Sequence, residues 1–330
     1  MKPSIVHVFG TELPHAWDIF KVFKPSEVVI SMQGIISECA SYYCSDLPNF
    51  IIKRKGIYEL VTMDSLVKQK NNFRKRGIKE TNVLKQAKYV IGRTDWDYAV
   101  VQSINPNITY MKCNETLRSS FYHTKWNIST IERYSIFISQ GSYPIKGLHN
   151  AILGLAEIKK EFQKVKLYVA GENILKNSVP GKRWKMSSYA RYIYDLINDN
   201  DLEGHVVFLG NLNENEMRER YLKAHVYLCS SVIENSPNSL GEAMLIGVPC
   251  VASWVGGIPT MLKHEEEGYL YQYNAVKMMS YYIKQVFKDD EKAKKLSYSA
   301  RRHATITHDP VENNRKLLEI YSYILGEMHQ

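Results

Sequence analysis

Short apolar runs rich in β-branched and aromatic residues alternate along this chain with stretches that carry apolar residues at helical spacing. The strand-like runs lie at residues 5–9, 27–31, 89–91, 135–139, 166–170, 206–209, 226–229 and 249–253. The helical spacing is clearest over 150–164, 189–197 and 278–287. Strands that alternate with helices pair in parallel, because each crossover helix returns the chain to the same edge of the sheet. The alternation therefore predicts an α/β protein with parallel sheets.

The length of the chain indicates two domains. A chain of 330 residues exceeds one comfortable hydrophobic core, and a hydrophobic content of 45% is ample for folding. The polar stretch HTKWNIST at 123–130 precedes the strand-like run at 135. We therefore expect the boundary between the domains near residues 125–132, with only about three strands before it.

Cysteine content, hydropathy and net charge limit the kinds of protein that this chain can be. The cysteines are odd in number and form no C-x-x-C pair, which argues against a disulfide framework and a zinc site: Cys39, Cys44, Cys113, Cys229 and Cys250. No window approaches the 18 apolar residues of a membrane span, and the N-terminus lacks a signal peptide's apolar core, so a cytoplasmic protein is expected. The net charge of +9 suits nucleotide diphosphates, lipid phosphates and anionic membranes, and by charge alone nucleic acid.

The stretch from 233 to 253 reads IENSPNSLGEAMLIGVPCVAS and sets Glu234 and Glu242 eight residues apart around a predicted helix start. Pro237 and Asn238 break the preceding strand, and Asn238 or Ser239 is the expected N-cap. The free N–H groups of a helix start bind an anionic diphosphate. Carboxylates beside it suit sugar hydroxyls, at roughly 1.5–3 kcal/mol for each charged hydrogen bond. A sugar linked to a diphosphate is the ligand that this stretch predicts.

A purely structural interpretation of the same stretch is also open. Ser239-x-x-Glu242 has the form of a capping box, in which Glu242 would bond the backbone N–H of Ser239 and have no ligand role. Glu234 has no comparable structural explanation, because a carboxylate at a strand end among Val, Ile and Cys is costly unless something uses it.

The Glu-x7-Glu pattern, continued by GVPCVA and by GGIP at 256–259, resembles the nucleotide-binding half of GT-B glycosyltransferases of retaining family 4, the glycosyl transferases group 1. The motifs HVFGTELPH (7–15), VISMQG (29–34) and VIGRTDWD (90–97) resemble a bacterial subgroup that makes surface polysaccharides. The resemblance implies two Rossmann-like domains facing a cleft: an acceptor-side domain over 1–130, a nucleotide-sugar-binding domain over 131–309 and a crossover helix over 310–330. The family's first domain normally holds six or more strands, so a shortened N-terminal domain is expected, with an unusually compact one as the alternative.

Each first-domain motif follows a strand, on the side where open α/β sheets bind ligands. The acceptor-side candidates are Glu12, His15, Gln33 and Arg93. The ordinary alternatives are that Arg93 pairs with Asp95 or Asp97 and that His15 caps or packs. Gln33 stands where many family members carry a histidine, so no histidine role carries over to this loop.

The segment QGSYPIKG at 140–147 resembles the family's phosphate loop. Lys146 is in place, but Gly141 occupies the position of the usual arginine, so the diphosphate would depend on Lys146, on the amides of Gly141 and Ser142, and on the helix start. A cation about 4 Å from a phosphate contributes around 4 kcal/mol at an effective dielectric near 20. A solvent-exposed lysine without a role is the alternative.

The resemblance further implies that Glu242 holds the ribose hydroxyls and that Glu234 contacts the donor sugar near its reacting carbon, with Lys146 as its catalytic partner. The donor-binding candidates are Gly141, Ser142, Gly171, Asn211, Asn238, Ser239, Leu240 and Glu242. The glycines at the strand ends in VAGE (169–172) and FLGNL (208–212) would let the backbone approach a base or ribose, and tight turns are their alternative. No metal and no cofactor are expected, since a UDP- or GDP-linked sugar is the substrate.

Two further patterns compete with these assignments. Asp95-Trp96-Asp97 has the Asp-x-Asp form that holds a divalent metal in GT-A enzymes, but it belongs to the wrong architecture. A basic run could contact a membrane or nucleic acid, and a solvated helix face is its default interpretation: Lys68, Lys70, Arg74, Lys75, Arg76 and Lys79. We rank lipid phosphate above nucleic acid, because Phe73 is its one aromatic residue and no nucleic-acid module surrounds it.

The function expected from the sequence is therefore a metal-independent retaining transferase that moves a sugar from a nucleotide donor to a glycan or lipid-linked acceptor in surface-polysaccharide synthesis. The expected location is the cytoplasm, with the inner face of the membrane as a candidate contact and no nucleic acid as partner. A nucleotide-sugar epimerase or hydrolase, and a donor-binding pseudoenzyme, are the alternatives. No paired carboxylates of the hydrolase kind can be placed.

Overall fold

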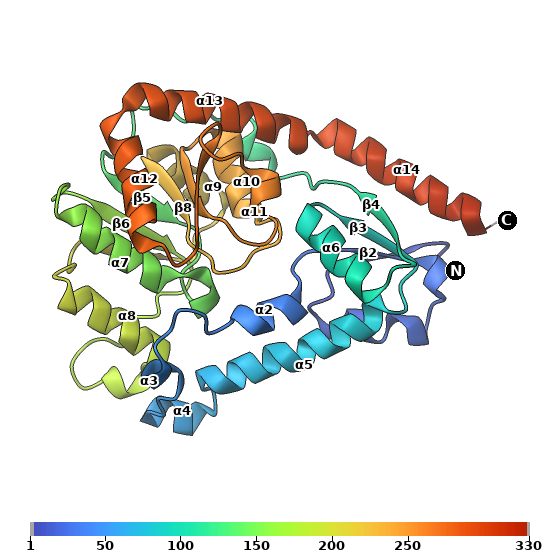
Figure 1. Ribbon diagram of the computed structural model, residues 1–330, viewed down its shortest axis with the longest axis horizontal. Coiled ribbons are helices and arrows are strands. Elements are labelled where there is room, and N and C mark those ends of the chain that lie inside the picture. The colour runs from blue at the N-terminus through green and yellow to red at the C-terminus, as the bar shows by residue number, and fades with distance from the viewer. Residues whose placement is uncertain (1–2, 329–330) are drawn as a thin grey trace.

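Two parallel sheets organise the computed structural model, which describes residues 3–328 (Figure 1). The first sheet has the order β1-β2-β3-β4, with β1 (Val6–Phe9), β2 (Val28–Ser31), β3 (Tyr89–Gly92) and β4 (Thr109–Lys112). The second has the order β10-β9-β8-β5-β6-β7, with β5 (Ser135–Ile138), β6 (Lys166–Ala170), β7 (Val206–Gly210), β8 (Val226–Cys229), β9 (Cys250–Ser253) and β10 (Gly268–Tyr271). The predicted α/β class with parallel sheets is confirmed.

All eight predicted strands form, and the structure adds two edge strands that the sequence did not reveal. The run that forms β4 begins and ends with polar residues, Thr109 and Lys112, and lies half exposed at the edge of its sheet. The other, β10, begins with glycine directly after three glutamates, and both residue types are depleted in strands. The first sheet therefore has four strands within residues 3–328, where about three were predicted.

The first sheet is covered on both faces. The helices between β1 and β4 are α1 (Pro14–Trp17), α2 (Ile36–Tyr42), α3 (Asn49–Ile52), α4 (Ile57–Thr62), α5 (Leu66–Leu84) and α6 (Asp95–Ile104). Because side chains alternate along a strand, Val28 and Ile30 pack with α1, α5 and α6, whereas Val29 faces the other way. On that opposite face lies α14 (Pro310–Met328), whose Ile320 and Ile324 pack against Val29. We call the part of the molecule around the first sheet the first half, and the part around the second sheet the second half. Figure 1 shows α14 crossing from the second half back to the first.

The strands of the second sheet and the helices around it share one large hydrophobic core. These helices are α7 (Leu148–Lys159), α8 (Ser188–Asp199), α9 (Glu214–Lys223), α10 (Asn238–Ile246), α11 (Ile258–Met261), α12 (Val276–Lys288) and α13 (Asp290–Thr307). The helices predicted at 150–164, 189–197 and 278–287 correspond to α7, α8 and α12, with shifted ends. Short 3₁₀ turns complete the chain: η1 (Ile19–Lys21), η2 (Pro25–Glu27), η3 (Ser119–Phe121), η4 (Pro144–Lys146) and η5 (Arg183–Lys185). No helix within residues 3–328 is long and apolar enough to span a bilayer.

The strand order of the second sheet locates a crevice. From β5 the chain builds outward through β6 to β7, and it then returns to the other side of β5 to build β8, β9 and β10. In open α/β sheets, ligands bind outside the carboxyl ends of the strands at such a reversal. The loops that follow β5 and β8 flank this point, and they carry Lys146 and Glu234.

A segment of the first half also contacts the second half directly. Helices α3 and α4 lie against α8 and η5 (Figure 1). The buried carboxylate of Glu59 in α4 accepts hydrogen bonds from the backbone N–H and the hydroxyl of Ser188, at 2.5 and 2.7 Å. Since Ser188 is the first residue of α8, this carboxylate serves an N–H group that the helix leaves free.

Candidate functional site

Lys146 and Glu234 meet at the strand reversal of the second sheet. The Lys146 Nζ lies 2.5 Å from Glu234 Oε1, and the Ser231 hydroxyl donates to the same oxygen at 2.8 Å. The lysine side chain is 29% exposed and the glutamate side chain 16%. Burial alone would lower the pKa of Lys146, but the adjacent Glu234 carboxylate outweighs it and the pKa is raised. Lys146 is thus a half-buried, charged partner of Glu234 and not the exposed lysine of the alternative interpretation.

Gly147 allows the two loops to approach so closely. It has a positive φ of 68°, and a Cβ atom there would lie 1.9 Å from the carbonyl oxygen of Ser230. Beside it, Val232 N–H donates to the Ile145 carbonyl at 2.9 Å, and the Ser230 hydroxyl donates to the Lys146 carbonyl at 2.9 Å. Gly147 therefore lets the loop that carries Lys146 lie directly against residues 230–232, and the two hydrogen bonds hold it there.

The Gly-Gly pair of GGIP holds the Glu234 loop from the other side. A Cβ atom on Gly256 would lie 2.0 Å from the Glu234 carbonyl oxygen, and Gly257 N–H donates to that oxygen at 3.0 Å. Glu234 is consequently held through its backbone by glycines and through its side chain by Lys146 and Ser231.

The start of α10 differs from the prediction. Pro237 is the N-cap residue and no side chain caps the helix, so the expected caps Asn238 and Ser239 are wrong. The Asn238 side chain extends to the first half of the molecule, while the Ser239 hydroxyl accepts a hydrogen bond from the Tyr227 hydroxyl at 2.9 Å. Leu240 is fully buried in the core. The Asn238 and Ser239 side chains therefore bond to distant residues instead of capping the helix.

Glu242 is paired with an arginine that the sequence analysis did not single out. Arg118 Nε and Nη2 each donate to one carboxylate oxygen of Glu242 at 2.7 Å, and the guanidinium lies over the Phe121 ring, 4.4 Å from its centroid. The capping box is therefore wrong for Glu242. Burial raises the pKa of this carboxyl, and Arg118 opposes the rise. Its ribose contact stays a prediction, with Arg118 as the group that orients it.

The amides of the expected phosphate loop are engaged by the chain itself. Gly141 N–H and Ser142 N–H both donate to Gln140 Oε1, at 3.0 and 3.1 Å, as does the Ser142 hydroxyl at 2.9 Å. Gly171, with φ of 95°, lies directly against the Gln140 side chain. A carboxamide oxygen thus sits where these donors would bind an anion. Asn211 is exposed just beyond β7, at the far edge of the sheet from β10.

Three of the four acceptor-side candidates lie at the carboxyl ends of strands in the first sheet. Glu12 follows β1, and its Oε1 accepts from Gly34 N–H at 2.5 Å. Gln33 follows β2 and Arg93 follows β3. His15 is exposed on α1 and belongs to none of the contacts described below.

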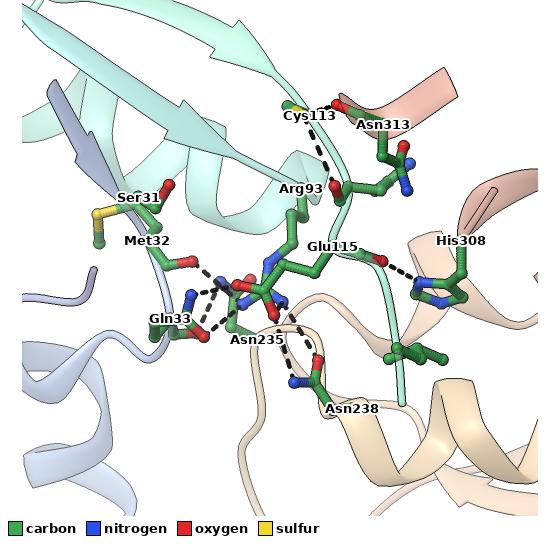
Figure 2. A network of polar contacts seen from close by, with 12 residues as sticks. Ser31, Met32, Gln33, Arg93, Cys113, Glu115, Asn235, Asn238, His308 and Asn313 are labelled. Carbon is green, nitrogen blue, oxygen red and sulfur yellow. Dashed lines mark hydrogen bonds and ion pairs between the residues drawn. The ribbon is translucent and has the colours of Figure 1, made fainter. Parts of the chain in front are cut away.

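Arg93 is the centre of a polar network between the two halves, shown in Figure 2. Its guanidinium lies 3.0 Å from Glu115 Oε2 and donates to the Met32 carbonyl at 3.1 Å and to Gln33 Oε1 at 3.3 Å. It also reaches Asn238 Oδ1 at 3.4 Å, at the start of α10. Arg93 is only 7% exposed. The alternative side-chain pairing with Asp95 or Asp97 is wrong, because the guanidinium pairs with Glu115 instead.

Asp97 has a structural role in the same junction. It closes a capping box with Thr94 at the start of α6 and accepts the backbone N–H of Arg93 at 2.9 Å. Asn235 Nδ2 donates to Asp97 Oδ2 at 3.0 Å, and the Thr94 hydroxyl donates to Asn235 Oδ1 at 2.7 Å. A residue next to Glu234 therefore joins the second half to the first.

Sequence reasoning missed four residues of this region: Glu115, Arg118, Gln140 and Asn235. Glu115 and Arg118 follow the overlooked β4, so the rule that polar residues cluster after parallel strands would have found them. Asn235 and Gln140 lie inside the quoted motifs, but nothing local distinguishes them from loop residues.

The comparisons with known proteins agree with this architecture. The family described as "Glycosyl transferases group 1" matches residues 119–303, more than half of the chain. An uncharacterized glycosyltransferase of Methanocaldococcus jannaschii is 30% identical over 137 residues, which cover 42% of this chain and 31% of the relative. The N-acetyl-alpha-D-glucosaminyl L-malate synthase of Bacillus anthracis is 31% identical over 109 residues, covering 33% and 28%. These matches thus span less than a third of either relative's length.

Solved structures resemble nearly the whole chain. Sucrose-phosphate synthase from Thermosynechococcus elongatus superposes with a TM-score of 0.74 at 15% identity, covering 98% of this chain and 74% of that one. Anabaena HepE, crystallised with UDP, gives 0.66 at 15% identity, covering 97% and 100%. At these identities the likeness shows the fold, and the GT-B arrangement of two Rossmann-like domains is confirmed. With its family match over most of the second half, the chain belongs to the glycosyl transferases group 1 family.

Proposed function

We propose that this protein is a metal-independent, retaining glycosyltransferase. It moves a sugar from a UDP- or GDP-linked donor to a glycan or lipid-linked acceptor in surface-polysaccharide synthesis, at the cytoplasmic face of the membrane. The observation that carries the proposal is the Lys146–Glu234 pair, held at the strand reversal beside the start of α10.

The donor diphosphate would bind between Lys146 and the start of α10. Lys146 supplies a positive charge, and the helix start supplies free N–H groups at the positive end of its dipole. The diphosphate competes with Glu234 for Lys146, so donor binding would release the Glu234 carboxylate toward the sugar. The Anabaena HepE structures with UDP and with UDP-glucose support a nucleotide-sugar donor.

In this proposal Glu234 stabilises the positive charge that develops on the sugar ring as the diphosphate departs. Lys146 stabilises the negative charge on the leaving phosphate. The acceptor hydroxyl attacks from the face that the diphosphate leaves, its oxygen bonds to the anomeric carbon, and its proton passes to the departing phosphate. This sequence of bonds retains the anomeric configuration.

The acceptor would enter from the first sheet, where Arg93 reaches the start of α10 and the Gln33 carbonyl contacts Asn235 just before it. Glu12 lies beside them, bonded to Gly34 N–H, and His15 is exposed on α1. A glycan acceptor is supported by Staphylococcus aureus TarM, which has the same fold and was crystallised with fondaparinux, alpha-GlcNAc-glycerol and UDP. Arg93 and Gln33 would exchange their bonds to Glu115 and Asn238 for bonds to acceptor hydroxyls.

Calorimetry with UDP and GDP, followed by a donor-consumption assay with and without glycan acceptors, tests the proposal. Consumption that requires an acceptor supports the transferase. Consumption without acceptor identifies an epimerase or hydrolase, and binding without consumption identifies a pseudoenzyme. Lys146→Ala and Glu234→Ala should abolish turnover, whereas Lys160→Ala and Glu157→Ala, which break an exposed ion pair on α7, serve as matched controls.

A further inference from the structure

Two segments that are distant in sequence combine basic and exposed apolar side chains on one rim of the molecule. The first comprises residues 50–78, which form α3, α4 and most of α5, and the second comprises residues 179–185 around η5. They meet where α4 contacts η5, and Lys55, Ile57 and Leu60 share a surface hollow with Arg183 and Trp184. Figure 1 shows α3, α4 and α5 following each other along the lower edge of the view. We call this surface the basic rim.

The apolar side chains of the basic rim are unusually exposed for a folded domain. Their exposed fractions range from 45% to 72%, in Phe50, Ile57, Leu60, Val61, Met63 and Trp184. Large apolar groups that gather on one surface mark a site that meets another apolar phase or partner. Trp184 is suited to a membrane interface, because its ring is apolar and its N–H is polar.

The positive charge of the chain is concentrated on the same rim. Its first segment, residues 50–78, contains eight basic and two acidic residues, a net charge of +6 within a chain whose total is +9. One of the two acids, Glu59, is buried against Ser188. A groove of about 700 Å³ between residues 52–55 and α5 is lined by six cations and by no acidic residue: Lys53, Arg54, Lys55, Lys68, Arg74 and Lys75. Of these six, Arg54 alone comes within 4 Å of a carboxylate in the described chain.

We propose that the basic rim docks the protein on an anionic lipid bilayer. The apolar side chains enter the interfacial region, and the cations of the groove pair with lipid phosphates. A soluble polyanion such as a nucleic acid would use the cations but would leave Leu60, Val61 and Trp184 in water. The combination of charge and exposed apolar groups therefore favours a membrane.

The docking surface includes parts of both halves, because residues 179–185 belong to the second half. The inference rests on the membrane location in the proposed function, for which it names a surface, and it does not depend on Lys146 or Glu234. A protein that fails to transfer sugar could still bind vesicles, and the reverse, so the two proposals fail independently.

Flotation of the full-length protein with vesicles tests the inference. We expect binding to vesicles of phosphatidylcholine with phosphatidylglycerol, little binding to phosphatidylcholine alone, and weakening at high salt. The double variant Lys68→Glu with Lys75→Glu should lower the partition coefficient at least about 25-fold, since each basic residue near an anionic surface contributes about fivefold. Leu60→Ser with Val61→Ser should lower it about fivefold to tenfold, because these side chains are partly withdrawn from water.

Matched controls lie on α13, where Lys295, Arg302 and Ile306 are also exposed. Lys295→Glu with Arg302→Glu, and separately Ile306→Ser, should leave vesicle binding unchanged, and thermal midpoints verify that every variant folds. Equal loss in the controls, equal binding to neutral vesicles, or no binding to anionic vesicles would overturn the inference. So would tighter binding to a single-stranded oligonucleotide that the Leu60→Ser and Val61→Ser changes leave unaffected.

Discussion

The two halves of the molecule hold their candidate site residues in different ways. In the second half, Lys146 and Glu234 contact each other across a strand reversal within one sheet, and glycines fix both loops. In the first half, the strands follow one another in order, so the sheet has no such reversal within residues 3–328. Arg93 there is held partly by Asn238, and the Gln33 carbonyl by Asn235, both from the other half.

The comparison teaches that the Lys146–Glu234 pair of the proposed donor side is assembled within one sheet, whereas the proposed acceptor side is completed by the contact between the halves. A change on the donor side should therefore alter chemistry without separating the halves. A change on the acceptor side should weaken their contact and leave nucleotide binding intact.

The largest expected effect comes from the donor side. Lys146→Met should lower kcat by about 10²–10³-fold, because it removes the positive charge that, in the proposed mechanism, stabilises the leaving phosphate. Steady-state kinetics with a saturating donor measures the change, and Lys160→Met provides a control on an exposed ion pair. If kcat of Lys146→Met stays within twofold of the unchanged protein, the donor side is not where the chemistry occurs.

The Arg118–Glu242 pair sharpens the comparison through stability. Arg118→Met should lower the free energy of unfolding by about 2–3 kcal/mol, since it leaves the buried Glu242 carboxylate without its cation while water reaches part of the site. Urea denaturation measures the loss. Arg133→Met, which breaks an exposed pair with Asp290, should cost less than about 1 kcal/mol. Equal losses in the two variants would show that burial of Glu242 is unimportant.

The acceptor side should respond in the opposite manner. Arg93→Met should lower the free energy of unfolding by about 2 kcal/mol, because Glu115 loses a charged partner that is nearly buried. The affinity for UDP, measured by calorimetry, should stay within about twofold, because the proposed nucleotide site lies in the other half. A large drop in UDP affinity would instead place Arg93 on the donor side and end the distinction drawn above.

The smallest effect concerns pH. Burial lowers the pKa of His149 and His225 in the second half, and of His7 in the first, to about 4. Unfolded histidine titrates near 6.5, so between that pH and about 4 the unfolded chain binds more protons and stability falls as pH falls.

At pH 5.5 this loss should be about 1 kcal/mol for each fully buried histidine, relative to pH 7.5. Urea denaturation of His225→Gln at the two pH values should show a correspondingly smaller loss. If the free energy of unfolding of His225→Gln falls between the two pH values as much as that of the unchanged protein, buried His225 is not a source of the pH dependence.

The sequence was most informative where the signals are local. Glu234 could be predicted because it lies in the loop after a β-run, and Lys146 because its segment resembles the family's phosphate loop. The Gly256–Gly257 pair likewise lies within a short motif whose close approach to Glu234 needs glycine.

Long-range partners could not be predicted in this way. Arg118 and Glu242 are 124 positions apart, and Arg118 follows the edge strand β4, whose sequence carries little apolar signal. The N-cap predicted at Asn238 is wrong for the same reason. The Asn238 amide donates to Glu115 in the other half instead of bonding the nearby helix N–H groups. Tertiary contacts override local preference at these positions.

The bond from Glu59 to the start of α8 has a consequence for motion. The chain itself passes between the halves before β5 and again at α14, and the α4–α8 contact adds a third tie at a different place. A rotation of one half away from the other must therefore either carry α4 along with α8 or break the two hydrogen bonds that Ser188 donates to Glu59.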